Sequence, residues 1–162
     1  MEALENGRYS GIILSSKRHE GLLSSVTSYN EYCFNNSEHY HNNAHFSFVL
    51  NGGCVEKKKD DYEIKPGGIT YYSAGEIHQV KKIAGVTRRI NVEIEESFFS
   101  QYNFSDEGLR QIIITNPDAK FIMVKIYQEL VISDNLSDIT IQMLFLQLIN
   151  QFESSSVQKK PQ

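Results

Sequence analysis

The sequence lacks the long apolar run that a membrane-spanning helix needs. No part of its 162 residues approaches the roughly 20 consecutive apolar residues that cross a bilayer. The N-terminal segment MEALENGRYS also lacks the basic and apolar regions of a signal peptide. We therefore expect a cytoplasmic protein that does not contact a membrane.

Cysteine and positive charge are both scarce. The two cysteines, Cys33 and Cys54, can form at most one disulfide, and because neither belongs to a CxxC pair we expect two reduced thiols. Acidic residues outnumber basic ones by 20 to 16, which gives a net charge of -4. The basic clusters at 57–59 and 159–160 are small and predict an exposed hairpin tip and a polar tail. Since phosphate binding needs clustered Lys and Arg, this chain alone is not expected to bind DNA strongly.

The residues that are present suit one folded domain. Hydrophobic residues make up 40% of the chain and charged residues 22%, which is typical of a globular protein. The length leaves no room for a second full-sized domain. The pattern changes near residue 96, with β-branched and aromatic alternation before it and helix-like apolar clusters after it.

The part before residue 96 is predicted to be a barrel or sandwich of short strands, because turn-forming Asn and Gly clusters separate its apolar segments. The last of these segments alternates, so that Arg88 and Arg89 face opposite sides. The polar parity favours Arg89 as the inward one, and an arginine facing solvent is the alternative. The predicted strands are 22–29, 45–50, 53–58, 69–72, 77–83 and 86–94.

The part after residue 96 is predicted to be helical. Asn116 and Pro117 are expected to start a helix that runs to about Ile132, because Asn caps free amides and Pro is tolerated at the first helical position. Ser137 is expected to cap a last helix over 138–152. The polar residues 154–162 are expected to form a linker or tail.

The last predicted helix carries more apolar surface than one partner covers. A broad face from Ile141 to Phe152 can pack on the barrel or the preceding helix. Three further apolar residues lie off that face and would otherwise meet water. We expect them to form a two-fold homodimer interface, and burial between the other helices is the alternative. These residues are Ile139, Met143 and Leu146.

Four of the five histidines lie in the β part at informative positions: His39, His41, His45 and His78. The first three share parity, so their side chains emerge on one face of a sheet. Imidazole is a good ligand for zinc, nickel, iron and copper, and a metal needs three or four such groups around one point. We predict that all four converge inside the barrel and bind a divalent transition metal. A metal-free polar pocket is the alternative.

Here the residues resemble a known family, the cupins. The segment 39–52 is similar to the first cupin motif, HxHxxxE followed by six residues and Gly, and 67–78 is similar to the second, with Gly75 and His78 in register. The resemblance implies a mainly β protein: a double-stranded β-barrel (jelly roll) over 1–95, followed by two or three α-helices over 96–153.

The sequence departs from the cupin pattern in two places. His45 stands where the family usually has Glu, and Ser73 and Lys82 stand where it has Pro and Asn. Exchange of a carboxylate for an imidazole removes a hard oxygen ligand. It therefore shifts the expected metal from manganese toward zinc, nickel, copper or iron.

Residues 20–160 also resemble the N-terminal domain of AraC-type transcriptional regulators in the order of their motifs. The resemblance implies an effector-sensing and dimerisation domain that binds a small molecule, and that acts on DNA only through a domain absent from this chain. The matching segments are 39–41, 46–52, the hairpin at 57–61, 64–68, 74–78 and the capped apolar helices.

Further polar residues are predicted to line a ligand pocket in the barrel, because small-molecule sites join apolar walls to a few polar groups. Tyr71 and Tyr72 alternate, so one of them belongs to the core. The predicted residues are Ser47, Tyr71, Tyr72, Arg89 and Asn91.

Two functions from different classes remain open. A regulatory domain needs a dimer interface, which the long apolar helices supply. A free-standing metal-dependent cupin enzyme (a dioxygenase, isomerase or decarboxylase) has no need of them. We therefore favour the regulatory domain and expect no enzymatic activity.

Overall fold

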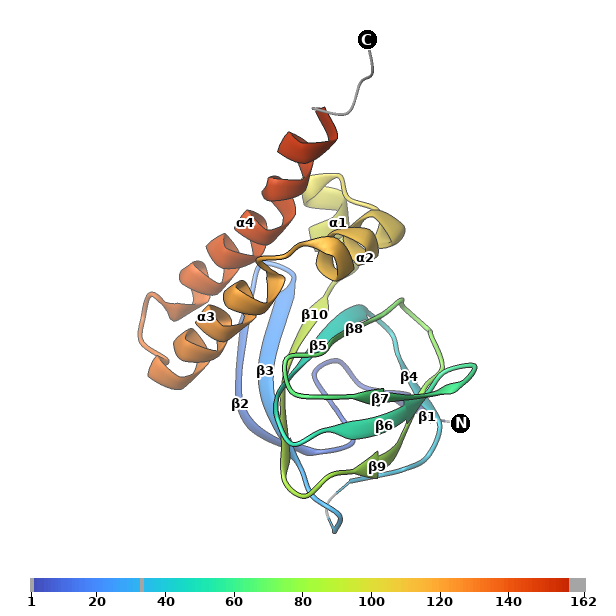
Figure 1. Ribbon diagram of the computed structural model, residues 1–162. Helices are drawn as coiled ribbons and strands as arrows, with labels where there is room; N and C mark the ends of the chain where they lie inside the picture. Colours follow the sequence, from blue (N-terminus) through green and yellow to red (C-terminus); the bar gives the residue numbers. More distant parts are fainter. Residues whose placement is uncertain (1, 33, 158–162) are drawn as a thin grey trace.

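The computed structural model describes residues 2–32 and 34–157, with side chains as far as residue 149. Strands form a barrel, and helices follow on one side of it (Figure 1). The strands are β1 (Glu2–Leu4), β2 (Ile12–His19), β3 (Leu22–Tyr29), β4 (His39–His41), β5 (Ala44–Asn51), β6 (Cys54–Lys57), β7 (Asp61–Ile64), β8 (Ile69–Tyr72), β9 (Gln79–Ile83) and β10 (Thr87–Ile94). The helices are α1 (Glu96–Tyr102), α2 (Asp106–Thr115), α3 (Ala119–Ile132) and α4 (Ser137–Val157).

Two antiparallel sheets build the barrel. The larger sheet has the strand order β2-β3-β10-β5-β8, and the smaller has the order β7-β6-β9. Strand β1 adds a short parallel pair with β4. The predicted jelly-roll barrel followed by helices is confirmed, with four helices in the described residues instead of two or three.

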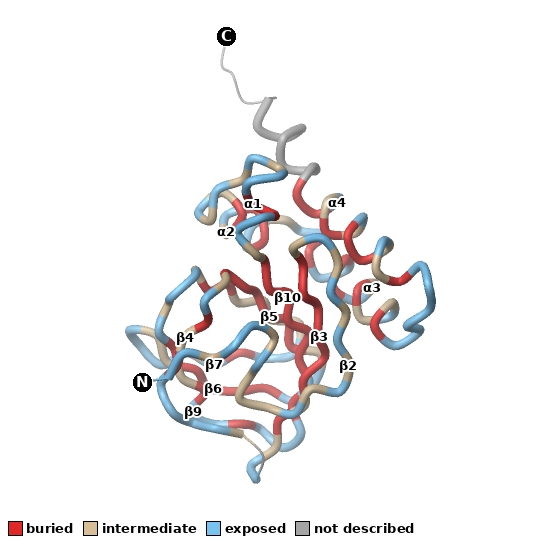
Figure 2. Tube along the Cα trace, turned by 180° about the vertical axis from the view of Figure 1, so that it is seen from behind, coloured by how far each residue is buried: buried red, intermediate tan, exposed pale blue. Residues whose placement is uncertain are grey.

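The main apolar core lies outside the barrel, between the larger sheet and the helices. Helices α3 and α4 contact β2, and α2 contacts β8. Figure 2 shows the buried residues concentrated along β3, β5 and β10 and on the inner sides of the helices. Along β10, Ile90, Val92 and Ile94 pack into this core. A sheet with one face against helices can keep polar side chains on the other, and this other face lines the barrel interior.

The polar face of β10 is buried inside the barrel. Arg89, Asn91 and Glu93 are 3%, 0% and 1% exposed. A small apolar cluster, which includes Tyr29 and Val49, shares the interior with them. Buried polar groups must find partners, so the barrel interior is organised by hydrogen bonds and ion pairs.

The six predicted strands appear within two residues of their expected bounds as β3, β5, β6, β8, β9 and β10. Strands β1, β2, β4 and β7 were not predicted. Three of these have only three or four residues, which is too short for a periodic signal. Strand β2 is an edge strand without a buried residue, so its sequence has no continuous apolar face.

The expected start of α3 is wrong. Asn116 donates its backbone N–H to the carbonyl of Ile112 at 2.9 Å, so it ends α2. Its side chain accepts a hydrogen bond from the backbone N–H of Asp118 at 2.8 Å, and α3 begins only at Ala119. Two helices therefore meet where the sequence suggested a single start.

Helix α4 begins at Ser137, one residue before the expected start. Its broad apolar face is buried at Ile141, Phe145 and Leu148, whereas the side chain of Phe152 lies outside the described part of the chain. The helix extends through Val157, past the expected boundary at 153. Residues 158–162 of the predicted tail are not described. No helix in the described residues is long and apolar enough to cross a membrane.

Candidate metal centre

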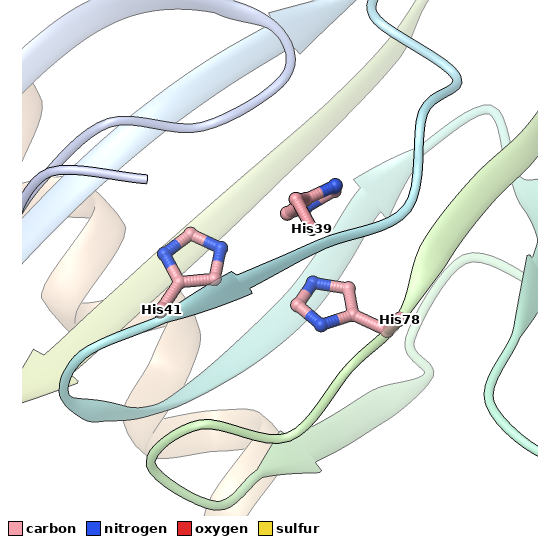
Figure 3. A group of neighbouring side chains, drawn as sticks. All are labelled: His39, His41 and His78. Carbon is pink, nitrogen blue, oxygen red and sulfur yellow. The ribbon is translucent and has the colours of Figure 1, made fainter. Parts of the chain in front are cut away.

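Three histidines are brought together by backbone pairing. His39 and His41 lie on β4, and His78 lies just before β9 (Figure 3). His39 and His78 exchange two backbone hydrogen bonds of 3.0 Å each, as a single antiparallel bridge. Gly75 donates its N–H to the carbonyl of His41 at 2.8 Å, so the segment before β9 follows β4 past both of its histidines.

The geometry of this triad suits a metal ion. His39, His41 and His78 are 4%, 2% and 5% exposed, and one nitrogen from each lies within 4.8 Å of the others. Nitrogens bound to a tetrahedral zinc at about 2 Å are about 3.3 Å apart. Small side-chain rotations therefore bring the three into a coordination sphere.

Hydrogen bonds define which nitrogen each ring can offer. His39 donates from Nδ1 to the carbonyl of Ser37 at 3.0 Å, and His78 donates from Nδ1 to the carbonyl of Glu76 at 3.1 Å. Because a carbonyl only accepts, each Nδ1 carries the proton of the neutral ring, and Nε2 keeps its lone pair. Metal-binding histidines are commonly oriented by such bonds from the other ring nitrogen.

The electrostatics keep the rings of His41 and His78 neutral. Burial, with the neighbouring histidines adding repulsion, lowers the pKa of His41 to about 3. Burial also lowers the pKa of His78 to about 4. Neutral imidazole is the form that binds metals. In addition, Nδ1 of His41 and Nδ1 of His45 are both buried without a hydrogen-bond partner among the described residues.

His45 is buried and lines the same cavity as the triad, so all four predicted histidines lie together inside the barrel, and a ligand role for His45 stays a prediction. Its ring centroid is 4.2 Å from that of His41, but its nitrogens do not belong to the group that lies within 4.8 Å. His45 comes from β5, opposite Tyr72 on β8, and its ring stacks on Tyr72 at 4.6 Å. Burial holds the pKa of His45 well below its ordinary value.

The cavity at the histidines is very small. Its volume is about 10 Å³, which is room for about one water molecule. It therefore has room for a single ion or one water molecule, and binding of a larger molecule requires the barrel to open. The cavity is lined by Tyr9, Ser10, Tyr29, His39, His41, His45, Ser47, Tyr72, His78, Val80 and Arg89.

The predicted pocket residues divide between the two faces of the sheet. Ser47, Tyr72 and Arg89 line the cavity. Asn91 is buried nearby and accepts a hydrogen bond from Ser47 at 2.5 Å, without lining the cavity. Tyr71 points the other way, into the core under the helices, and donates to Asp106 on α2 at 2.6 Å. Tyr71 is therefore not a pocket residue, because neighbours on a strand face opposite sides.

A buried ion pair below the histidines was not foreseen. Glu56 on β6 is 0% exposed and pairs with Arg89. Its Oε2 accepts hydrogen bonds from the hydroxyls of Tyr72 and of Tyr62, the latter at 3.0 Å. The sequence did offer one sign of this ion pair. Strand alternation favoured an inward position for Arg89, and a buried guanidinium needs a carboxylate partner. Which acid would supply it was not visible, because Glu56 precedes a lysine run that looks solvent-exposed.

The N-terminal segment closes one side of the cavity. Glu93 on β10 accepts hydrogen bonds from the backbone N–H of Gly7 at 2.8 Å and from the side-chain amide of Asn43 at 2.9 Å. The ring of Tyr9 lies against that of His41, with a centroid distance of 5.2 Å. The sequence contains no periodic signal for the hydrogen bond between Gly7 and Glu93, because these residues are more than eighty positions apart.

No family model matches the sequence, and no curated protein is similar to it. Solved structures similar to the fold include a putative mannose-6-phosphate isomerase from Ralstonia eutropha, with 13% identity, a TM-score of 0.46, and coverage of 55% of this chain and 88% of the other. A cupin superfamily protein from Desulfitobacterium hafniense has 17% identity, a TM-score of 0.44 and coverage of 59% and 84%. A cupin-2 domain protein from Shewanella frigidimarina has 12% identity, a TM-score of 0.43 and coverage of 56% and 84%.

These matches are distant, and the description of the fold rests on the strand order of the chain itself. The chain has a cupin-type barrel followed by helices, with a buried group of three histidines that can hold a metal ion.

Proposed function

We propose that this domain binds a divalent transition metal through His39, His41 and His78. The observation that carries the proposal is the pair of Nδ1 hydrogen bonds to the carbonyls of Ser37 and Glu76, which leave two Nε2 lone pairs free in a buried site. A set of neutral imidazoles suits zinc, nickel, copper or iron better than manganese. A metal ion bound there would act as a Lewis acid and would lower the pKa of a water molecule bound to it.

Elemental analysis after mild dialysis, followed by titration with Zn²⁺, tests this proposal. We expect close to one equivalent of metal for the unaltered protein and loss of binding in His41→Ala. The matched control is His19→Ala, because His19 lies on β2 outside the cavity. Less than about a tenth of an equivalent of any transition metal, with no binding on titration, would contradict the proposal.

We further propose that the domain is the effector-sensing and dimerisation part of an AraC-type regulator. The order of the sequence motifs and the helices that follow the barrel support this assignment. The cavity of about 10 Å³ limits the effector, in this conformation, to the metal itself or to a very small molecule that completes its coordination. A larger effector requires the barrel to expand.

Dimerisation is proposed through the outer face of α4. Ile139 and Met143 are 52% and 61% exposed, and Leu146 is partly buried. Exposed apolar groups on one helix face favour self-association, and a two-fold contact lets the same face meet its copy. Light scattering at micromolar concentration should give twice the monomer mass for the unaltered protein. It should give the monomer mass for Met143→Asp combined with Leu146→Asp, and a dimer that survives both changes would contradict this interface.

DNA binding is proposed only for a domain outside this chain. The reading frame of the gene tests this point. About 100 further residues with two helix-turn-helix units would support the regulator, because such units place recognition helices in the major groove.

A metal-dependent enzyme is the second candidate. Three protein ligands leave a coordination position open, as in catalytic zinc sites, whereas structural sites are filled by four. A reading frame that ends soon after α4, without a helix-turn-helix, would favour this candidate over the regulator.

A further inference from the structure

We infer that Glu76 is a positioning residue for the metal ligand His78 and ties this ligand to helix α2. The inference rests on the proposed metal binding. It concerns the segment 73–78, which connects β8 to β9 and carries His78 at its end.

The carboxylate of Glu76 closes the turn in which it lies. Its Oε2 accepts a hydrogen bond from the backbone N–H of Ser73 at 2.9 Å, and its own backbone N–H donates to the carbonyl of Ser73 at 3.0 Å. Gly75 adopts a φ of +75° within the turn and is bonded to the carbonyl of His41. The side chain therefore stabilises a turn that is anchored on the strand of the other two ligands.

The backbone of Glu76 sets the orientation of His78. Its carbonyl accepts the Nδ1 proton of His78 at 3.1 Å, which directs Nε2 of this ring to the triad. The carbonyl can hold this direction only while the turn keeps its shape. Because the carboxylate of the same residue maintains the turn, Glu76 acts on the ligand through both its side chain and its backbone.

Two cations hold the carboxylate from different parts of the fold. Lys58, in the hairpin between β6 and β7, lies 2.7 Å from Oε1, and Arg110 on α2 lies 3.3 Å from Oε2. Lys58 also donates to the carbonyl of Tyr71 at 2.6 Å and lies over the ring of Tyr72, 4.3 Å from its centroid. Lys58 is thus fixed in place, although the lysine run suggested an exposed hairpin tip.

The side chain of Glu76 is 24% exposed and that of Lys58 23%, so water screens this network only in part. The carboxylate of Glu76 therefore connects three parts of the fold: the hairpin between β6 and β7, the turn before His78, and helix α2. Metal binding at His78 and the docking of α2 on the barrel are therefore coupled, and coupling between two sites acts equally in both directions.

Titration of Zn²⁺ in competition with a chromophoric chelator, on the full chain, tests the positioning role. Glu76→Gln keeps the size of the side chain and removes its charge. We expect it to weaken zinc binding about 10- to 100-fold, the usual effect of losing a group that orients a metal ligand. The matched control is Glu63→Gln on β7, because the side chain of Glu63 is 65% exposed and its carboxylate lies 3.9 Å from Lys65. It should bind zinc as the unaltered protein does.

A second readout separates positioning from a general loss of structure. In the metal-free protein, the ¹⁵N shifts of the imidazole should show His78 protonated at Nδ1. In Glu76→Gln they should show a mixture of both tautomers, while the tautomer of His39 stays unchanged. This measurement needs no metal. If the unaltered protein does not bind zinc, the proposed function is contradicted. The positioning role of Glu76 is then decided by the tautomer of His78 alone.

Arg110→Gln tests the link to α2 and remains available if Glu76→Gln does not fold, since Arg110 is at the surface with 34% of its side chain exposed. We expect zinc binding to weaken about 5-fold or more. Saturating zinc should slow hydrogen exchange of the α2 amides in the unaltered protein but not in this variant. Unchanged zinc affinity in Glu76→Gln together with an unchanged His78 tautomer would overturn the positioning role, and zinc-independent exchange of α2 would overturn the link.

Discussion

Replacement of Glu56 by leucine should destabilise the barrel severely. Glu56 is 0% exposed and the side chain of its partner Arg89 is 4% exposed, so both charges lie away from water. In Glu56→Leu the guanidinium keeps only the thiol of Cys54 as a hydrogen-bond partner among the described residues. The hydroxyls of Tyr62 and Tyr72 also lose their carboxylate acceptor, although they remain 3.4 Å from each other.

The expected loss follows from the burial of the charge that remains. Removing one partner of a buried ion pair typically costs about 3–5 kcal/mol, because the other charge stays buried and uncompensated. For a domain of this length, about 2–4 °C of Tm per kcal/mol corresponds to a drop of about 10 °C. The loss is a large part of the roughly 5–15 kcal/mol by which domains are stable.

Urea unfolding followed by far-UV circular dichroism measures this loss, since the chain has no tryptophan. The double variant Glu56→Leu with Arg89→Met removes both charges and should recover most of the stability. Glu63→Leu, a change at an exposed carboxylate on the neighbouring strand, should stay within about 0.5 kcal/mol of the unaltered protein. A loss below about 1 kcal/mol in Glu56→Leu, or a double variant no more stable than the single one, would refute the reasoning.

Three further predictions concern the cavity and its surroundings. His41→Ala should lower zinc affinity more than about 100-fold, and His45→Ala less than about 10-fold, because only His41 belongs to the group of three proposed ligands; equal losses in a competition titration would show that His45 is a fourth ligand. Tyr9→Ala should speed the release of zinc to a chelator several-fold, because the ring covers His41, and an unchanged release rate would argue against a covering role. Burial raises the pKa of Cys54 to about 11, so at pH 8 only about one thiol in a thousand is ionised. In a Cys33→Ser background it should therefore react with a disulfide reagent only when the protein unfolds, and rapid labelling of the folded protein would contradict this.

Much of the β part was predictable because its side-chain pattern is local. Alternation along 86–94 placed Ile90 and Arg89 on opposite faces, and the structure has Ile90 in the core under the helices and Arg89 inside the barrel. The shared parity of His39 and His41 likewise placed both rings on one side of β4. A period of two depends only on strand geometry, so it can be read without knowledge of the partner strands.

Other features depended on contacts between distant segments. The acid that compensates Arg89 comes from β6, and the carbonyl that orients His78 belongs to a turn closed by Glu76. Edge strand β2 has no continuous apolar face, and the N-terminal segment contributes Tyr9 and Ser10 to the lining of the cavity. None of these has a local signature in the sequence.

The sequence by itself determined which histidines face the barrel interior, because parity along a strand decides the side on which a side chain emerges. Only the tertiary structure brought nitrogens of His39, His41 and His78 within 4.8 Å of one another, in a group to which His45 does not belong. The distance between nitrogens on different strands depends on register and on the neighbours of each ring. The ring of His45, for example, stacks on Tyr72, a contact that the pairing of β5 with β8 brings about.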